Sequence, residues 1–389
     1  MEAPFSKCLT WRIEAWAHTA VAAIVGHLPP QTVFHFGEVV GKMIWPLMKA
    51  RQKTIARNLR IAGIADGGAS IDELAKRSFI RTTANLVSSS VAANLPPGRL
   101  GEILEVENPE LMEEAVAEGR GVILLLAHMG NWELLTRLHR FLPKGTKSGA
   151  FYRPLNNLIL NERVLKEREA DGTRLFSKRD SLHLVSGFLR ENGVVGILAD
   201  QRVGLQGEVV SFFGRLTRAS PLPSLLARRC KSEVISLSLR TVAPGKWSAR
   251  YHTVHKPYNS ANCMEALERA MMVSPMDVFW LQERWKIYLT PGIPFGNWFK
   301  KEDARGLKAH RGLVWRKVGE ETLQLPQACV HGDIEYEEAT GRTVDELKGI
   351  DLAKPLPIDF IMVFSENPEL AKVAKQLGIP IMRAGNFSK

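Results

Sequence analysis

The chain has few cysteines and no long apolar run near its start. Its four cysteines lie far apart along 389 residues, and no two of them form a CxxC pair: Cys8, Cys230, Cys263 and Cys329. This spacing argues against a zinc ribbon or a disulfide scaffold and fits a reducing compartment. The apolar stretch 15–28 has 14 residues, whereas a membrane-spanning helix needs about 20. We therefore expect a helix in the membrane interface, and no cleavable signal peptide.

Nucleotide-binding motifs are also missing. Neither a P-loop nor a GxGxxG turn after an expected strand occurs, so nucleotide chemistry has no support. The chain is short of acidic residues, with 41 against 52 basic ones and a net charge of +11. Residues 1–300 carry this excess, because residues 301–389 hold 13 basic and 14 acidic side chains. The excess points to an anionic partner, which is a nucleic acid, an anionic lipid or an acidic protein.

The N-terminal region, residues 1–60, combines apolar helices with a basic run. Helices are expected over residues 11–28 and 31–48, and five basic residues then follow between Lys49 and Arg60. This order suits an anionic membrane surface, where each Lys or Arg adds about 1 kcal/mol. The alternative, a helix pair of the core with a solvated basic face, stays open.

An alternation of helical and strand patterns follows. Helices are expected over 71–93, 108–118, 131–141, 155–170, 181–190, 222–229 and 275–285, and strands over 121–127, 194–198, 208–212, 233–240 and 248–255. The alternation predicts an α/β fold with a mixed central sheet flanked by helices. Pro and Gly between 291 and 296 separate a domain of residues 61–292 from a small α/β appendix, residues 300–389. In the appendix we expect strands over 359–365 and 379–382 around a helix over 368–377.

The segment from Ala127 to Glu133 (AHMGNWE) carries the sharpest chemical signal. His128 ends an apolar strand, and ligands of open α/β sheets bind at the carboxyl ends of strands. A histidine there can take a proton from a hydroxyl near neutral pH. Glu133 lies five positions further, within reach of the ring across a tight turn, and could orient the ring and stabilise its cation. The alternative is that His128 has a structural role only and that Glu133 is an acid favoured by the dipole at a helix N-terminus.

Four ordered stretches carry a family resemblance. HMGNWE resembles the histidine-acid motif of the bacterial lipid A late acyltransferases, which belong to the lysophospholipid and glycerolipid acyltransferase group. FYRPLNN from Phe151, LADQR from Leu198 with VSFFG from Val210, and WLQERWK from Trp280 resemble further family segments in the same order. The resemblance covers about residues 10–290. It implies a glycerolipid-acyltransferase-like fold on the cytoplasmic face of the bacterial inner membrane, either peripheral or with a single N-terminal anchor.

The resemblance also implies a reaction. An acyl chain moves from a thioester, usually on acyl carrier protein, to a hydroxyl of an anionic lipid A precursor, in lipopolysaccharide biosynthesis. His128 is then the general base and Glu133 its orienting carboxylate, with no cofactor and no metal. We expect substrate-binding roles for seven residues, with Arg153 as the cation for the oxyanion: Asn131, Arg153, Asp200, Arg202, Arg215, Arg218 and Arg284.

Three alternatives remain at this point. An acyl-CoA-dependent phospholipid or other glycolipid acyltransferase would carry the same motifs. A non-catalytic basic protein that binds membranes or nucleic acid would work without His128, although no RRM, OB or helix-turn-helix pattern supports nucleic-acid binding. A hydrolase would use the same histidine to activate water and would release free fatty acid.

Overall fold

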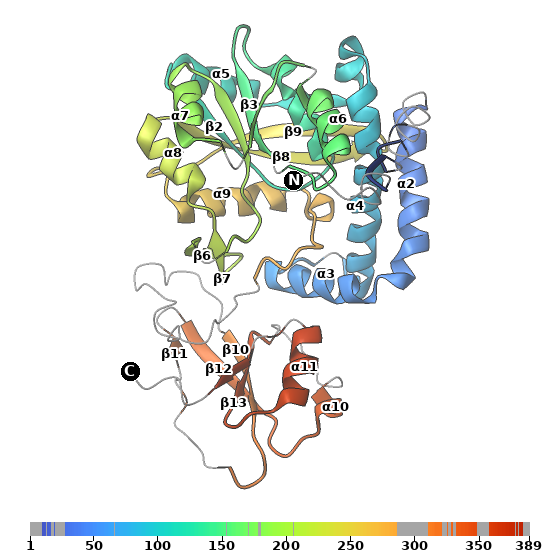
Figure 1. Ribbon diagram of the computed structural model, residues 1–389, viewed down its shortest axis with the longest axis vertical. Coiled ribbons are helices and arrows are strands. Elements are labelled where there is room, and N and C mark those ends of the chain that lie inside the picture. Colours follow the sequence, from blue (N-terminus) through green and yellow to red (C-terminus); the bar gives the residue numbers. More distant parts are fainter. Residues whose placement is uncertain are drawn as a thin grey trace. The chain divides into compact units, whose positions relative to one another are not determined.

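The computed structural model describes residues 10–12, 14–16, 19, 28–65, 67–152, 154–169, 171–177, 180–204, 206–285, 310–320, 325, 328–329, 332–347, 358–377, 379 and 381–383. The chain divides into two compact units (Figure 1). The first comprises residues 1–52, 73–200 and 221–281, and the second comprises residues 53–72, 201–220 and 282–389.

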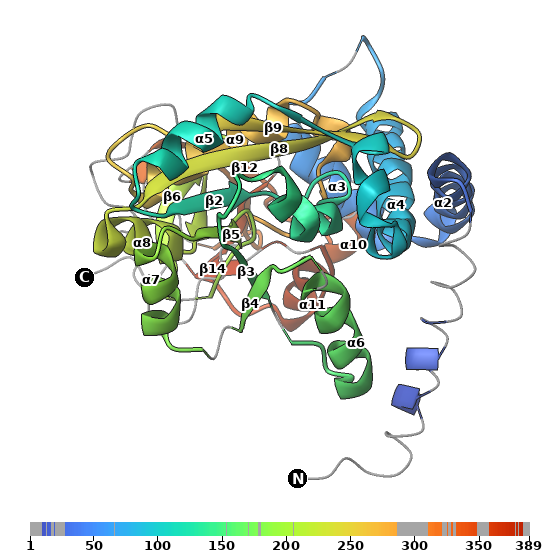
Figure 2. The same cartoon turned by 90° about the horizontal axis from the view of Figure 1, so that it is seen from above.

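A seven-stranded sheet forms the centre of the first unit. Its order is β1-β9-β8-β2-β5-β3-β4, and Figure 2 shows the strands from β9 to β4 following one another across the unit. The strands are β1 (Leu104–Glu107), β2 (Val122–Leu126), β3 (Ser148–Tyr152), β4 (Arg174–Ser177), β5 (Val194–Leu198), β8 (Glu233–Ala243) and β9 (Lys246–Thr253). Strands β8, β2, β5, β3 and β4 are parallel, whereas β9 is antiparallel to β8. The predicted mixed central sheet is confirmed.

Helices cover both faces of this sheet. The helices of the first unit are α2 (Pro30–Ile44), η1 (Trp45–Leu47), α4 (Ile71–Asn94), η2 (Pro97–Glu102), α5 (Pro109–Ala117), η3 (Trp132–Phe141), α6 (Leu158–Glu169), α7 (Leu182–Arg190), α8 (Leu222–Cys230), α9 (Ser260–Met272) and η4 (Pro275–Asp277), and α3 (Lys49–Ala62) begins in the first unit but belongs mostly to the second. Sequence-level signals start several of them. Ser181 caps α7 by accepting from the backbone N–H of His183, and Pro109 opens α5.

Strands β2 and β5 are the buried middle of the sheet. All five residues of β2 (VILLL) are buried, as are four of the five of β5. Continuous apolar runs of this kind are typical of parallel strands with both faces covered. Phe188 of α7 packs over Gly149 on one face of the sheet. The opposite face, which includes Leu124 and Leu126 of β2, turns toward η3 and α6.

Helices α2 and α4 pack closely because two glycines of α2 face α4. A Cβ atom on Gly37 would lie 2.6 Å from the Cα atom of Ala84, and one on Gly41 would lie 3.0 Å from that of Ile80. The residues described between 10 and 19 are helical. Among the described residues, no helix is both long and apolar enough to cross a membrane.

The second unit contains two further sheets. Strands β6 (Glu208–Phe212) and β7 (Arg215–Ala219) form an antiparallel pair. A five-stranded sheet has the order β11-β12-β10-β13-β14, and its four longer strands are parallel. Its elements are β10 (His310–Trp315), β11 (Ala328–Cys329), β12 (Gly332–Glu338), α10 (Val344–Leu347), β13 (Phe360–Val363), α11 (Pro368–Leu377) and β14 (Ile381–Arg383).

The helix predicted over residues 275–285 is wrong. Only η4 forms there, after which Val278 makes a β-bridge with Met129 and the chain turns at Trp280. Two interactions explain this. The buried Asp277 carboxylate accepts from the backbone N–H of Thr241 at 2.8 Å, and Phe279 donates its backbone N–H to the carbonyl oxygen of His128. These bonds to other elements replace the bonds that a helix would make internally.

Candidate active site

Two neighbouring parallel strands bring His128 and Asp200 together. Leu126 of β2 pairs with Leu198 of β5, and each chain continues by two residues, to His128 and to Asp200. The carboxyl ends of parallel strands meet at one edge of the sheet, so the two side chains leave it side by side. The Nδ1 atom of His128 lies 2.6 Å from Oδ1 of Asp200. The imidazole is 15% exposed and the carboxylate is fully buried.

The backbone around His128 is held by the segment 277–279 at the end of η4. Phe279 donates its N–H to the carbonyl oxygen of His128 at 2.8 Å, and Gly130 donates its N–H to that of Asp277, also at 2.8 Å. Gly130 has φ +56°, and a Cβ atom there would lie 2.5 Å from the carbonyl oxygen of Leu239. Only glycine fits both the left-handed turn and this close approach.

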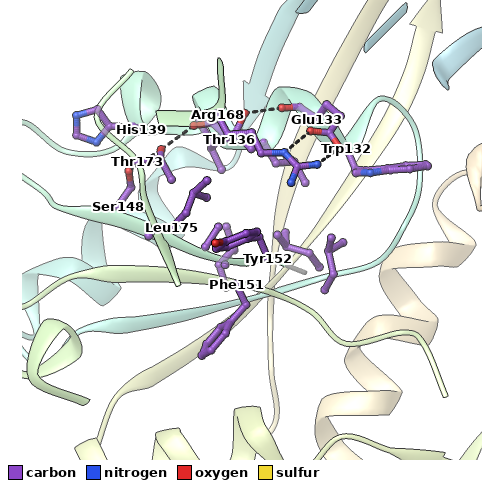
Figure 3. A pocket seen from close by; sticks show the side chains of 18 of the residues that line it. Trp132, Glu133, Thr136, His139, Ser148, Phe151, Tyr152, Arg168, Thr173 and Leu175 are labelled. Carbon is purple, nitrogen blue, oxygen red and sulfur yellow. Dashed lines mark hydrogen bonds and ion pairs between the residues drawn. The ribbon is translucent and has the colours of Figure 1, made fainter. Parts of the chain in front are cut away.

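Glu133 lies in the first turn of η3 and forms an ion pair with Arg168 of α6. Its two carboxylate oxygens accept from Nε and an Nη atom of Arg168 at 3.0 and 2.8 Å, a two-pronged geometry that gives strong, directional bonds. Figure 3 shows this pair beside Trp132, whose ring meets that of His128 edge-on with centroids 5.4 Å apart. The carboxylate hydrogen-bonded to His128 is that of Asp200, so the orienting role of Glu133 stays a prediction.

Asn131, between His128 and Glu133, is 1% exposed. No described residue hydrogen-bonds its amide oxygen or its amide nitrogen. A buried amide without a partner costs about 1–3 kcal/mol, which is a reason for it to meet a substrate or a water molecule. Its predicted substrate contact remains a prediction.

A cavity of about 240 Å³ opens beside His128. It lies between one face of the sheet and the layer formed by η3 and α6, and Figure 3 shows its side chains. Leucines from β2, β5 and η3 form much of the wall, including Leu124, Leu126, Leu135 and Leu198. His128, Glu133 and Arg168 also line it. A proton acceptor therefore borders an apolar cavity that suits a hydrocarbon chain.

Comparison with known proteins identifies the family. Residues 3–287 match the family model of the bacterial lipid A biosynthesis acyltransferases. The chain belongs to this family. It is an acyltransferase, and the resemblance found in its motifs is confirmed.

The curated relatives of this acyltransferase are lipid A acyltransferases and phosphatidylinositol mannoside acyltransferases, all at low identity. The lipid A biosynthesis palmitoleoyltransferase of Escherichia coli K12 is 21% identical over 286 residues, which are 70% of this chain and 90% of the relative. The lipid A biosynthesis lauroyltransferase of the same organism is 22% identical over 284 residues, with the same coverages. A phosphatidylinositol mannoside acyltransferase of Mycolicibacterium smegmatis is 29% identical over 136 residues, covering 33% of this chain and 43% of the relative.

The other predicted site residues of the acyltransferase fall in two groups. Arg153 lies outside the described residues. Arg202, Arg215, Arg218 and Arg284 belong to the second unit. There Arg215 is 1% exposed and forms an ion pair with Asp359, and Arg218 donates to the carbonyl oxygen of Gly207.

Burial lowers the pKa of two arginines of the second unit. Burial and, after it, the nearby charge of Arg57 lower the pKa of Arg215 to about 9. The pKa of Arg57 is also lowered by burial, against an opposing contribution from Glu283. Arg215 and Arg218 have structural partners inside their own unit, and the substrate contacts predicted for them, Arg202 and Arg284 stay predictions.

Two contributors to the acyltransferase site were not predicted, namely Arg168 and the segment 277–279 at the end of η4. Arg168 lies in an ordinary charged helix, and no local pattern distinguishes it. The pairing of His128 with Asp200 did have a signal, because both central strands end in the same pattern, Leu-Ala followed by a polar residue, at 126–128 and 198–200. Among the described residues, no three His, Cys, Asp or Glu side chains gather as a metal site.

Proposed function

We propose that this acyltransferase moves a fatty acyl chain from an acyl thioester to a hydroxyl of a lipid A-type glycolipid precursor. One observation carries the proposal: His128, whose ring is hydrogen-bonded to Asp200, borders an apolar cavity inside the region that matches the family. The names of the two E. coli relatives support lipid A as the acceptor.

The mechanism needs one base and no covalent acyl-enzyme. With its Nδ1 atom bonded to Asp200, His128 uses Nε2 to take the proton of the acceptor hydroxyl. The hydroxyl oxygen attacks the thioester carbonyl and forms a tetrahedral oxyanion. The C–S bond then breaks, and His128 returns its proton to the leaving thiolate. Asp200 stabilises the imidazolium, Glu133 with Arg168 borders the site, and Arg153 stays our predicted cation for the oxyanion.

The donor is proposed to be acyl carrier protein, with acyl-CoA as the alternative. Acyl carrier protein is acidic, and the +12 net charge of residues 1–300 would speed its encounter with the enzyme. A steep fall in kcat/KM with added salt for the carrier-protein donor, but not for a neutral thioester analogue, would support this choice. An equal salt response for both donors would contradict it.

We propose that the protein works at the cytoplasmic face of the inner membrane. The support is an exposed apolar stripe on α2 and η1: Phe36, Val39, Met43 and Leu47 are 58, 51, 72 and 76% exposed. Exposed Lys49, Arg51 and Lys53 follow the stripe. An amphipathic helix with basic neighbours binds anionic interfaces.

Vesicle sedimentation tests the membrane proposal. We expect binding to vesicles that contain anionic lipid and clearly weaker binding to neutral ones. Replacing Met43 and Leu47 by Glu should release the protein, because two charges would enter the apolar layer. The exposed Val318, in the second unit, provides a control, and Val318→Glu should bind like the wild type. Equal binding by both variants would contradict the proposal.

An acyl-transfer assay tests the reaction itself. Purified protein in detergent would receive carrier-protein and CoA thioesters, with an under-acylated lipid A precursor or a phosphatidylinositol mannoside as acceptor. We expect the lipid A precursor to gain the mass of one acyl chain, and His128→Ala to abolish the gain. His183→Ala, at an exposed position of α7, is the matched control and should keep full activity. Acylation of the mannoside alone would reassign the acceptor, and free fatty acid without transfer would indicate a hydrolase.

A further inference from the structure

A buried carboxylate lies behind the turn that carries His128. Asp277, the last residue of η4, is 2% exposed. One of its oxygens accepts from the hydroxyl of Thr241 at 2.6 Å and from the side-chain amide of Asn85 at 3.1 Å. The other accepts from the backbone N–H of Thr241 at 2.8 Å and from the hydroxyl of Ser274 at 2.6 Å. Four hydrogen bonds therefore fix the position of this side chain.

The partners of Asp277 belong to the central sheet and to a helix packed beside it. Asn85 of α4 is 1% exposed, and its amide oxygen accepts from the indole N–H of the buried Trp247 at 2.7 Å. Trp247 belongs to β9 and Thr241 to β8, and Figure 2 shows both strands extending toward α4. Arg81 of α4 adds a positive charge 3.7 Å from the carboxylate. The carboxylate is thus tied to three elements of the first unit.

The backbone of Asp277 reaches the catalytic turn directly. Residues 277–279 pair in antiparallel fashion with residues 128–130, through a β-bridge between Val278 and Met129 and two backbone hydrogen bonds of 2.8 Å on either side of it. The side chain of Asp277 takes no part in this pairing. It fixes the position of the segment 277–279, and the segment in turn fixes the backbone of the catalytic histidine.

The ring of Phe279 extends this contact to the imidazole. Its centroid lies 6.5 Å from that of His128 and 5.6 Å from that of Trp132. The imidazole is held elsewhere by its 2.6 Å bond to Asp200. A hydrogen bond weakens steeply when its atoms move out of line, so a displaced segment 277–279 would disturb the bond between His128 and Asp200.

From this we infer that Asp277 is a positioning residue of the transfer reaction. Its carboxylate holds the segment 277–279, and that segment keeps His128 in line with Asp200 and with the hydroxyl of the acceptor. This assignment rests on the proposed function, since it takes His128 as the general base. Positioning of this kind has a large effect on rate, because a displacement of about 1 Å can cost about 10²-fold.

Replacing Asp277 by Asn tests its positioning role. The amide places an N–H group where the carboxylate accepts hydrogen bonds, so at least one donor loses its partner and the segment 277–279 shifts. We expect kcat to fall by about 10- to 100-fold. KM should change by about twofold or less, because the cavity keeps all its residues. Thr241→Val removes one donor and keeps the shape of the side chain, so it should lower kcat in the same direction but by less.

Asp171→Asn is the matched control. Asp171 is also a buried carboxylate of the first unit, and it forms its ion pairs with Arg137 and Arg140. Its replacement destabilises the protein without removing a bond to the segment 277–279, so kcat of the folded protein should stay within about twofold of the wild type. An equal fall of kcat in Asp171→Asn and Asp277→Asn would assign the loss to stability and overturn the positioning role.

Proton NMR of the imidazole keeps the test independent of transfer. The Nδ1 proton that His128 shares with Asp200 lies in a short, charge-assisted bond, so it should resonate at low field, and its absence in His128→Ala assigns it. We expect Asp277→Asn to shift or broaden this resonance and Asp171→Asn to leave it in place. A shift in an enzyme that transfers no acyl chain would support the positioning role and contradict the proposed function alone. An unchanged resonance in Asp277→Asn would overturn the positioning role, whatever the enzyme transfers.

Discussion

At the residue scale, the pairing of His128 with Asp200 makes the sharpest prediction. Asp200→Asn keeps the shape of the side chain but removes its charge, so the imidazolium formed during transfer loses its stabilising partner. We expect kcat to fall by about 10³- to 10⁴-fold, as when the carboxylate beside a catalytic histidine is replaced by an amide, with little change in KM. Steady-state kinetics would measure both.

Asp180→Asn is the matched control for that variant. Asp180 is exposed and accepts from the backbone N–H of Ser177, so its replacement should leave kcat within twofold of the wild type by roughly the scale of surface substitutions. If Asp200→Asn kept most of its activity, Glu133 would become the better candidate for the orienting carboxylate.

A second residue-scale prediction concerns acid stability. Burial raises the pKa of the Asp171 carboxyl, but hydrogen bonds and charges from Arg137 and Arg140 outweigh it, so the pKa lies below its usual value. The resulting stabilisation is fully present above the unfolded pKa of about 4 and is lost as pH falls through the lower folded pKa. We expect Asp171→Asn to cost about 3 kcal/mol at pH 7, because two arginines lose their anion.

Urea unfolding followed at pH 7 and at pH 3 would measure this cost. The wild type and Asp171→Asn should differ clearly at pH 7 and less at pH 3, because the carboxylate of the unfolded chain, with a pKa of about 4, is then protonated and part of the stabilisation is lost. A difference that did not depend on pH would assign the loss to packing rather than to charge.

At the scale of elements, α2 and α4 can pack closely because glycines of α2 have no side chain at the contact. Gly37→Ala would place a Cβ atom 2.6 Å from the backbone of Ala84, and overpacking of this kind costs about 1–3 kcal/mol. Gly187 in α7 has no atom within 4 Å of a built Cβ, so Gly187→Ala should stabilise the protein by about 0.5–1 kcal/mol through helix propensity. Gly37→Ala should therefore lower Tm and Gly187→Ala should raise it. A lower Tm for both variants would contradict the packing argument.

Elements with a strong local pattern were predicted closely. The strands over 194–198 and 208–212 and the helix over 368–377 have the predicted bounds, because apolar runs, turn residues and a proline at the helix start define them locally. Within the central sheet, strands β1, β3 and β4 were missed. They have four or five residues and include polar ones, such as Arg174 and Ser177, and they form strands because neighbouring strands supply their hydrogen bonds.

The site shows the same division between local and distant information. His128, Gly130 and Glu133 were predicted from one short motif. The hydrogen bond between His128 and Asp200 depends on the order of strands in the sheet. The contact of Phe279 with the His128 backbone depends on a segment whose own sequence predicts a helix. Sequence patterns describe neighbours along the chain, whereas these contacts join residues 72 and about 150 positions apart.

At the scale of the whole molecule, the chain beyond residue 287 shares a compact unit with parts of the family region. Within that unit, Asp359, the residue before β13, forms an ion pair with the buried Arg215 of β7 and accepts from the backbone N–H of Arg311. The C-terminal sheet therefore supplies the anion that compensates a buried cation of the family region.

This contact predicts a local loss of stability in Asp359→Asn. Removing one partner of a buried ion pair costs about 3–5 kcal/mol, so amide hydrogen exchange in β7 and β13 should become faster. Strands β2 and β5, in the first unit, should keep their protection and serve as the internal reference. Unchanged exchange in β7 would show that Arg215 finds another anion.

The parallel pairing of β2 with β5 has a consequence for synthesis on the ribosome. His128 leaves the ribosome long before Asp200, and between them the chain must complete β3, α6, β4 and α7 before β5 can take its place beside β2. A nascent chain that has just exposed the HMGNWE motif contains His128 but not yet the Asp200 carboxylate that orients its ring. Premature termination anywhere in that interval therefore releases a fragment that has the family motif but not the assembled pair.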